Sequence, residues 1–155
     1  MTGDKNKHDI LTIYMNVEEA MSNLYKIYSK KFPDWYEFWF DLYMAEMKHA
    51  ALIRGLSRRV ESGEITFNDN RFDVIVISSA LKNIGILESN AHGKDIEIKY
   101  ALQVALDMEN SLLEKNMYKI FETDSEALKK LLLHLHQETE EHKETVKKAL
   151  ETLSS

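Results

Sequence analysis

Glu46-Met47-Lys48-His49 is the stretch that decides the fold, because it sets a carboxylate and an imidazole three residues apart. Glu18 precedes Glu46 by 28 residues and stands alone among apolar neighbours. In a helix, residues three apart project from one face, so Glu46 and His49 can act on the same ion. The segment therefore predicts a helix with a metal-binding face, and Glu18 predicts a ligand from a neighbouring helix.

The same pattern recurs in the second half of the chain. Glu109 stands alone there, and Glu138-Thr139-Glu140-Glu141-His142 follows it, with Glu138 29 residues and His142 33 residues after Glu109. The second copy differs in one respect, because Glu138 lies four residues before His142 and Thr139 occupies the three-residue position. Two similar sets of carboxylate and imidazole predict a two-metal site.

Apolar residues recur every three to four positions in four segments, which predicts four long helices. We expect the first from about Lys7 to Ser29 and the second from roughly Pro33 to Glu61, where Ser62-Gly63 ends it. The third begins near Asp95, a good N-cap, and reaches Ile120. The fourth opens at the capping box Thr123-Asp124-Ser125-Glu126 and runs to Leu150.

These helices carry apolar stripes that should form the core, and the candidate metal ligands fall on the same stripes. The apolar positions are Ile10, Tyr14, Val17, Met21, Leu24, Tyr25 and Tyr28, then Phe38, Leu42, Ala45, Leu52, Ile53 and Leu56, then Ile98, Leu102, Ala105, Leu112 and Ile120, and finally Leu128, Leu131, Leu132, Leu135, Val146 and Leu150.

The segment from Gly63 to about Lys94 is too long for a tight hairpin, so it is expected to be a crossover between the second and third helices. A helix of the length of the second spans on the order of 43 Å, a distance that about thirty residues containing a short helix can recross. Phe72 to Glu88 is periodic enough to supply that helix. The pattern predicts an all-α chain, a four-helix bundle with one long crossover.

Composition agrees with one helical domain spanning residues 1–155 and excludes several classes of protein. The chain has one proline, five glycines and 30% charged residues, which is typical of helix-rich proteins. A net charge of -6 disfavours nucleic acid as a partner. No apolar run approaches the roughly 20 residues that cross a bilayer, and the polar start lacks a signal peptide. We therefore expect a cytoplasmic protein with no membrane partner.

Carboxylates on core stripes indicate bound cations, because an ionised carboxylate taken out of water costs several kcal/mol unless it is paired or bound to a cation. The chain has no cysteine, so thiolate zinc and iron-sulfur sites are excluded. Oxygen and imidazole ligands suit iron or manganese, with zinc as an alternative. The candidate metal ligands are Glu18, Glu46, His49, Glu109, Glu138 and His142.

The chain resembles the ferritin-like, rubrerythrin-related di-iron carboxylate proteins, in which two helices give one glutamate each and two give a Glu-x-x-His pair. The resemblance runs from Ile10 to Leu150. Glu18-Glu19-Ala20, with Tyr25 seven residues after Glu18, resembles the family's first-helix pattern. Ala45-Glu46-Met47-Lys48-His49-Ala50 is a close fit to its second helix, and Met108-Glu109-Asn110 fits the third more loosely.

The resemblance implies a ferritin-like bundle with two iron ions that reacts with dioxygen or peroxide as an oxidoreductase. Glu46 would bridge both ions and His49 would bind one. The rubredoxin-like module of rubrerythrins needs paired Cys-x-x-Cys motifs, so this chain would need a separate electron donor protein. We also expect a homodimer, with the aromatic segment Trp35 to Tyr43 in the core and the subunit interface.

The fourth helix departs from the family pattern and leaves three interpretations open. A local π-bulge brings Glu138 into place, Glu138 binds from an altered angle, or the second metal position is weakened. We favour Glu138 as a ligand. Two other functions remain as alternatives: iron oxidation and storage in a higher oligomer, and a structural bundle with a decayed metal site, which Thr139 supports. His134 and His136 point to different helix faces and are interpreted as surface or interface histidines.

Overall fold

The structure is a computed structural model of the chain, and it describes residues 2–64, 66–67, 74–93, 95–111, 121–122 and 125–154. The chain divides into two compact units, Met1–Lys94 and Asp95–Ser155. Within the described ranges there are five α-helices, and the only strands are two segments of two residues each. The predicted all-α class is therefore confirmed.

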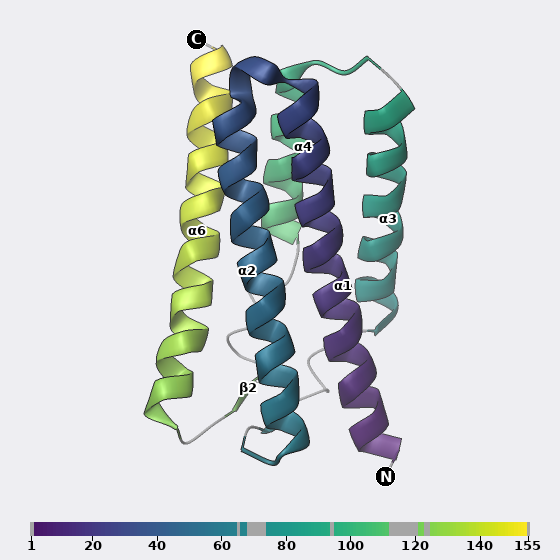
Figure 1. Cartoon of the computed structure of the whole chain (residues 1–155), viewed down its shortest axis with the longest axis vertical. Helices are drawn as coiled ribbons and strands as arrows, with labels where there is room; N and C mark the ends of the chain where they lie inside the picture. The colour runs from purple at the N-terminus through teal and green to yellow at the C-terminus, as the bar shows by residue number, and fades with distance from the viewer. Residues whose placement is uncertain are drawn as a thin grey trace. The chain divides into compact units, whose positions relative to one another are not determined.

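The first unit is built on three helices. They are α1 (Thr2–Lys31), α2 (Tyr36–Glu61) and α3 (Val74–Gly93), and a two-residue strand, β1 (Thr66–Phe67), lies between α2 and α3. Figure 1 shows α1 side by side with α2 and with α3, and α1 packs against both. α1 and α2 run in opposite directions, so they form a helical hairpin.

Two local signals set the bounds of α2. Phe32 has a non-helical backbone (φ -119°, ψ 79°), as expected before a proline, and Pro33 opens a short 3₁₀ helix, η1 (Pro33–Trp35), that turns the chain into α2. At the other end Gly63 has a positive φ of 82°, and its N–H donates to the carbonyl of Val60 over 3.1 Å. The predicted helix end at Ser62-Gly63 is confirmed.

The core of the first unit follows the predicted stripe of α1, in which every described member is buried. From α2, the predicted Leu42, Ile53 and Leu56 are buried as well. Phe38 is only half-buried, whereas Trp39, which was expected in the core or the subunit interface as part of the aromatic segment but was not placed on the helical stripe, is completely buried. The Trp39 ring lies 4.9 Å from the ring of Tyr28 and 5.7 Å from that of Tyr25, so one aromatic cluster fixes α2 against α1.

The second unit contains α4 (Ile98–Ser111), the two-residue strand β2 (Phe121–Glu122) and α6 (Glu126–Ser154), with α4 packed against α6. α4 begins three residues later than the predicted Asp95. The predicted continuation of this helix to Ile120 lies outside the described residues. At the start of α6, Ser125 Oγ accepts a hydrogen bond from the Leu128 N–H over 3.4 Å, so Ser125 occupies the N-cap position.

The predicted crossover helix exists as α3, although it ends five residues beyond the predicted Glu88. α3 follows α2 and precedes α4, and it brings the number of α-helices in the described ranges to five. The ferritin-like arrangement of four long helices in one domain stays a prediction. None of the helices in the part of the chain that the structure describes has the length and apolar character to span a membrane.

Candidate metal centre

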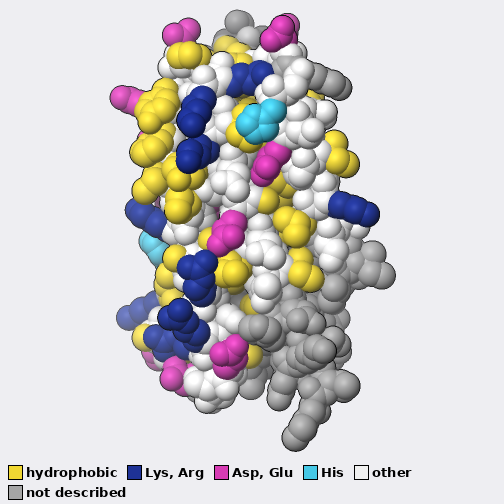
Figure 2. Space-filling view, turned by 45° about the vertical axis from the view of Figure 1, so that its right-hand side comes forward, with side chains coloured by type: hydrophobic (Ala, Val, Ile, Leu, Met, Phe, Trp, Pro, Cys, Tyr) yellow, Lys and Arg dark blue, Asp and Glu magenta, His cyan; other side chains and the backbone are white. Residues whose placement is uncertain are grey.

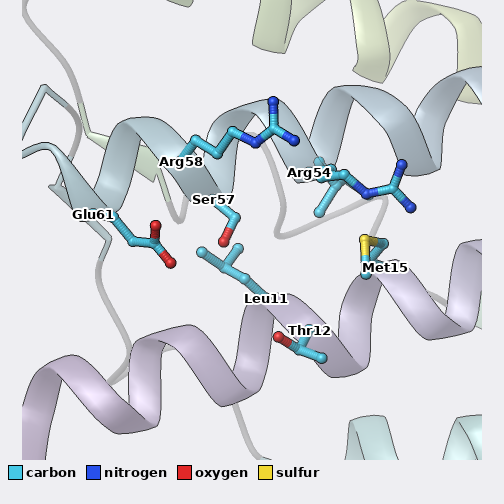
Figure 3. Close-up of a pocket in the computed structure, with 8 residues that line it drawn as sticks. Leu11, Thr12, Met15, Arg54, Ser57, Arg58 and Glu61 are labelled. Atoms are coloured by element: carbon cyan, nitrogen blue, oxygen red, sulfur yellow. The ribbon is translucent and has the colours of Figure 1, made fainter.

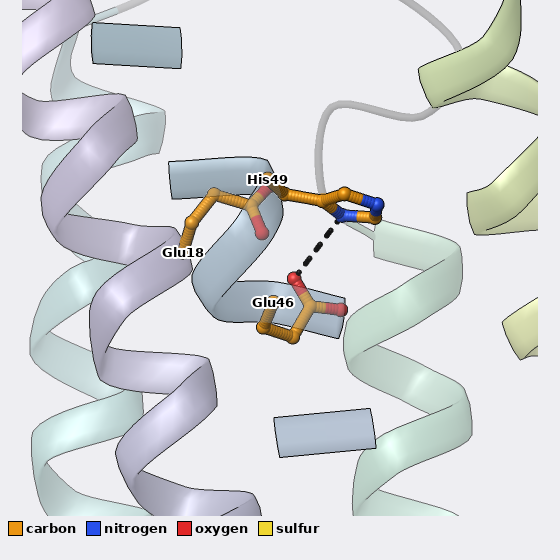
Figure 4. A group of neighbouring side chains, drawn as sticks. All are labelled: Glu18, Glu46 and His49. Atoms are coloured by element: carbon orange, nitrogen blue, oxygen red, sulfur yellow. Dashed lines mark ion pairs between the residues drawn. The ribbon is translucent and has the colours of Figure 1, made fainter. Parts of the chain in front are cut away.

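Three of the predicted ligands meet inside the first unit. Glu18 comes from α1, and Glu46 and His49 come from α2 (Figure 4). Each offers one ligand atom, and these atoms all lie within 4.8 Å of one another. Glu18 is 8% exposed, Glu46 1% and His49 3%, so the cluster is in the core. The sequence prediction that these residues point inward from two helices is confirmed.

The distance between the two ligands on α2 fits a shared cation. His49 Nδ1 lies 3.6 Å from Glu46 Oε2, and both belong to one helical turn (Figure 4). Two donor atoms that each bind an ion at about 2.1 Å can be at most about 4.2 Å apart. The Glu46–His49 pair satisfies this limit with the side chains as they lie.

Packing and two polar contacts hold Glu18 opposite α2. Its neighbours Val17 and Met21 are buried, which fixes the inward face of α1. One turn further on, the Ser22 hydroxyl donates to the Tyr43 carbonyl over 3.3 Å. The adjacent Glu19 points outward instead, and its Oε1 lies 3.1 Å from Arg54 on α2. Glu18 is therefore buried beside α2, whereas the adjacent Glu19 is on the exposed side of α1.

The charge of this cluster also fits a cation. Two carboxylates and one imidazole share a core region, and buried carboxylates are costly unless a cation or strong hydrogen bonds compensate them. The donors are oxygen and nitrogen only, which suits iron, manganese or zinc. The residues present therefore fit a divalent metal ion.

A cavity of about 230 Å³ lies between α1 and α2 (Figure 3). Its lining residues are near Glu18 and His49 in the sequence. Met15 is three residues before Glu18, and Ile53 is four residues after His49, so the cavity begins about one turn from the cluster on both helices. Its lining is Leu11, Thr12, Met15, Ile53, Arg54, Ser57, Arg58 and Glu61. This cavity can hold a small molecule near the candidate ligands.

In the second unit, Glu109 on α4 and His142 on α6 come together. Their ligand atoms lie within 4.8 Å of each other. Glu109 is 2% exposed, and His142 is half-buried. The second copy of the sequence pattern therefore also brings a carboxylate and an imidazole together from two helices.

Glu138 has a different environment from the other candidate ligands. It is half-buried, and its Oε1 lies 3.1 Å from Nε2 of His134, an exposed residue one turn earlier on α6. The Thr139 hydroxyl donates to the Leu135 carbonyl over 2.8 Å. α6 is α-helical from Glu126 to Ser154, so the π-bulge interpretation is wrong. Glu138 as a metal ligand stays a prediction.

The sequence interpretation missed the contact between His134 and Glu138. His134 was interpreted only as a surface or interface histidine, and its exposure agrees with a surface position. The four-residue spacing between His134 and Glu138 was the available signal, because side chains at that spacing are neighbours on a helix.

No protein-family model matches the chain. No curated protein matches it. No solved structure matches it. The buried carboxylate and imidazole side chains of the two units are therefore the features that bear on function.

Proposed function

We propose that this protein is a di-iron oxidoreductase of the ferritin-like type that reacts with dioxygen or peroxide. The observation that carries the proposal is the buried group of Glu18, Glu46 and His49, with its ligand atoms within 4.8 Å of one another. Manganese or zinc are alternative ions, since the donor set is compatible with each.

In this proposal Glu18, Glu46 and His49 hold one ion, and Glu109, Glu138 and His142 supply the second set of ligands. The repeat of the sequence pattern supports this assignment, as does the approach of Glu109 and His142 within the second unit. Iron bound to these groups would supply the redox chemistry toward dioxygen or peroxide.

The residues of the chain contribute charge, orientation and exclusion of water. The carboxylates of Glu18 and Glu46 compensate the charge of a cation, and the imidazole of His49 supplies a neutral donor at Nδ1 or Nε2. Buried neighbours such as Val17, Ala50 and Ile53 keep bulk water away from these groups. The cavity beside Met15 and Ile53 supports access by a small oxidant. Electrons would come from a separate donor protein, because the chain contains no cysteine for a rubredoxin-like module.

One observation favours a weaker version of this function. The Thr139 hydroxyl is engaged with the Leu135 carbonyl, and Glu138 lies beside His134. A second metal position that lacks a well-placed carboxylate would bind its ion weakly. The chain would then hold one tight ion, as expected for a partly decayed site.

Anaerobic titration of Fe(II) into the full chain tests the proposal. We expect about two ions per chain, or one tight and one weak ion. Glu46→Ala should remove one tight ion per chain, because it deletes one of the two buried carboxylates that would hold the ion in the first unit. Glu19→Ala is the matched control, since Glu19 is a glutamate of the same region that points outward to Arg54. An equal number of tight ions in Glu46→Ala and in the unmodified protein, or the absence of any tight ion in the unmodified protein, contradicts the proposal.

A further inference from the structure

The cavity between α1 and α2 has an apolar side. Leu11 is 2% exposed and Ile53 is completely buried, and the half-buried Met15 lies beside them. Figure 3 shows Leu11 and Met15 projecting from α1 toward α2. Binding sites for small molecules combine an apolar lining of this kind with a few polar groups that fix the orientation of the ligand.

Two hydroxyl groups supply polar atoms to the same cavity. Thr12 comes from α1 and Ser57 from α2, and both side chains are half-buried (Figure 3). Elsewhere in the structure the hydroxyls of Thr139 and Thr145 donate to the carbonyl four residues earlier. Thr12 and Ser57 make no such bond within the part of the chain that the structure describes. Both hydroxyls can therefore donate to a ligand.

Two arginines line the cavity from α2, and they differ in their partners. Arg54 Nη2 lies 3.1 Å from Glu19 Oε1, so its charge is compensated within the protein. Arg58 has no ion pair with any described residue. The adjacent Arg59 is not part of the lining, and it pairs with Glu64 over 2.9 Å. The Arg58 guanidinium therefore offers its N–H donors to an anion.

The end of α2 has exposed charges of both signs. Arg58, Arg59, Glu61 and Glu64 are all exposed. Figure 2 shows Lys and Arg side chains together with Asp and Glu side chains low on the left of the face it views. Glu61 also lines the cavity, and its carboxylate would repel a second negative charge. Only a ligand with a single negative charge therefore suits a lining that contains both Arg58 and Glu61.

The volume of the cavity limits the size of its ligand. A cavity of about 150 Å³ binds benzene, which has six non-hydrogen atoms. At the same ratio, 230 Å³ suits a ligand of about nine non-hydrogen atoms. Pockets for larger ligands usually exceed about 300 Å³. The ligand is therefore smaller than a nucleotide or a flavin.

We propose that this cavity binds a small organic monocarboxylate. The carboxylate accepts hydrogen bonds from the Arg58 guanidinium and from the hydroxyls of Thr12 and Ser57. The apolar part of the ligand lies over Met15 and Ile53, the lining residues closest in sequence to Glu18 and His49. This site is additional to the proposed di-iron function, and it does not depend on a bound metal because none of its residues is a candidate metal ligand.

Hexanoate, whose size fits the cavity, is the first probe. It is titrated into the metal-free full chain after the chelator has been dialysed away, because a carboxylate could also bind to an ion. We expect a dissociation constant on the order of 1 mM, with the largest NMR shifts in the backbone amides of residues 11–15 and 53–58. Hexanamide, which has no charge, should bind at least about tenfold more weakly. No binding of hexanoate, or equal binding of hexanamide, overturns the proposal.

Arg58→Gln should weaken hexanoate binding by about tenfold or more, because it removes the charged donor. Arg59→Gln is the matched control, since Arg59 is the adjacent exposed arginine and pairs with Glu64 instead. Its affinity should stay within about twofold of the unmodified protein. Equal weakening by both variants shows general attraction to a basic surface and overturns the proposal. Circular dichroism and thermal melts establish that each variant is folded.

Glu61→Gln tests the sign of the ligand charge. It should tighten hexanoate binding, because it removes a negative charge from the lining. Weaker binding by Glu61→Gln contradicts a carboxylate at this position.

The length of the alkyl chain tests the apolar side. Each methylene group buried in the cavity should tighten binding by up to about fourfold, so hexanoate should bind about tenfold more tightly than butyrate. Decanoate should gain little over octanoate, because the cavity is then full. Affinity that rises at one rate up to decanoate shows binding to an open surface and overturns the proposal. Iron binding is measured separately by Fe(II) titration, so this site and the di-iron function can fail independently.

Discussion

Glu18, Glu46 and His49 occupy core positions where apolar side chains would pack more favourably in the absence of a cation. Their ligand atoms are within 4.8 Å of one another, so two carboxylates are held close together away from solvent. Groups arranged in this way reduce the stability of the metal-free protein, and that cost is typical of functional sites. The proposed metal site can therefore be tested through stability as well as through binding.

Glu46→Gln should stabilise the metal-free protein while it weakens metal binding. The amide keeps the shape of the side chain but removes a buried charge, so the free energy of unfolding should rise by about 1 kcal/mol or more. Thermal melts in the presence of a chelator measure this change. Glu19→Gln, on the exposed side of α1, should change stability by less than about 0.5 kcal/mol. A metal-free Glu46→Gln protein that is less stable than the unmodified chain contradicts the expectation.

Glu138→Ala should have a milder effect on bound iron than Glu46→Ala. Glu138 is half-buried and lies beside His134, so only the second ion, if any, depends on it. Thr139→Glu should tighten the second ion, because it restores the three-residue spacing to His142. Counting tight sites by anaerobic Fe(II) titration of each variant separates these outcomes. If Glu138→Ala removes both ions and Glu46→Ala keeps them, the assigned roles are wrong.

At the scale of elements, α3 contains an acidic group whose environment differs from water. Burial raises the pKa of the Glu88 carboxyl above its ordinary value of 4.5, and the nearby His92 opposes that rise by stabilising the charged form. The folded protein therefore holds this proton more tightly than the unfolded chain. Because unfolding releases the proton, the free energy of unfolding falls as pH rises from about 4.5 through the folded pKa.

Glu88→Gln should remove this pH dependence. The variant should be more stable than the unmodified chain near pH 7, and the difference should shrink as pH falls toward 4. Solvent screening limits the gain to under about 1 kcal/mol. Chemical denaturation at several pH values measures it. His92→Gln should raise the pKa of Glu88 further, because it removes the attraction between His92 and the carboxylate, so the free energy of unfolding should continue to fall up to a higher pH. If the stability advantage of Glu88→Gln grows as pH falls, the assigned direction of the pKa shift is wrong.

The helices differ in how well the sequence predicted them, and the reason is local. Pro33 and Gly63 impose backbone conformations that no neighbouring contact can override, so both bounds of the second predicted helix were close to the observed ones. The end of α3 was predicted five residues too early, at the end of the apolar pattern, although Gly93 was an available stop signal. α3 extends to Gly93, where the Lys31 ammonium donates to the Ala91 carbonyl over 2.7 Å. This contact joins residues 60 positions apart, so a local pattern does not predict it.

Side-chain placement on α2 shows the same limit. Helical periodicity identified Leu42, Ile53 and Leu56 as buried, but it chose Phe38 where the structure buries Trp39. The two residues are adjacent, and their ring centroids lie 5.1 Å apart. Which of the two rings is buried depends on Tyr25 and Tyr28 on α1, because these rings contact Trp39 and set the space available for it. Packing between α1 and α2 therefore determines which of two adjacent aromatic residues is buried, and hydrophobicity alone does not distinguish them.

For the whole molecule, the sequence repeat coincides with the division into two units. Glu18, Glu46 and His49 all belong to Met1–Lys94, and Glu109, Glu138 and His142 all belong to Asp95–Ser155. The repeat predicted which residues meet in the first unit because helix phase alone brings Glu46 and His49 together. The repeat did not predict the partner of Glu138, because His134 lies outside the repeated pattern, although its four-residue spacing from Glu138 was a signal in the sequence.

α2 contributes Glu46 and His49 from a single turn, and α1 contributes Glu18 from the facing helix. An ion bound by all three side chains would join the two helices through a contact that the unfolded chain lacks, so it would add to the free energy of unfolding. The backbone amides of α1 and α2 would then exchange their hydrogens with solvent more slowly in the metal-loaded protein. Hydrogen exchange would therefore locate the ion within the chain without any substitution.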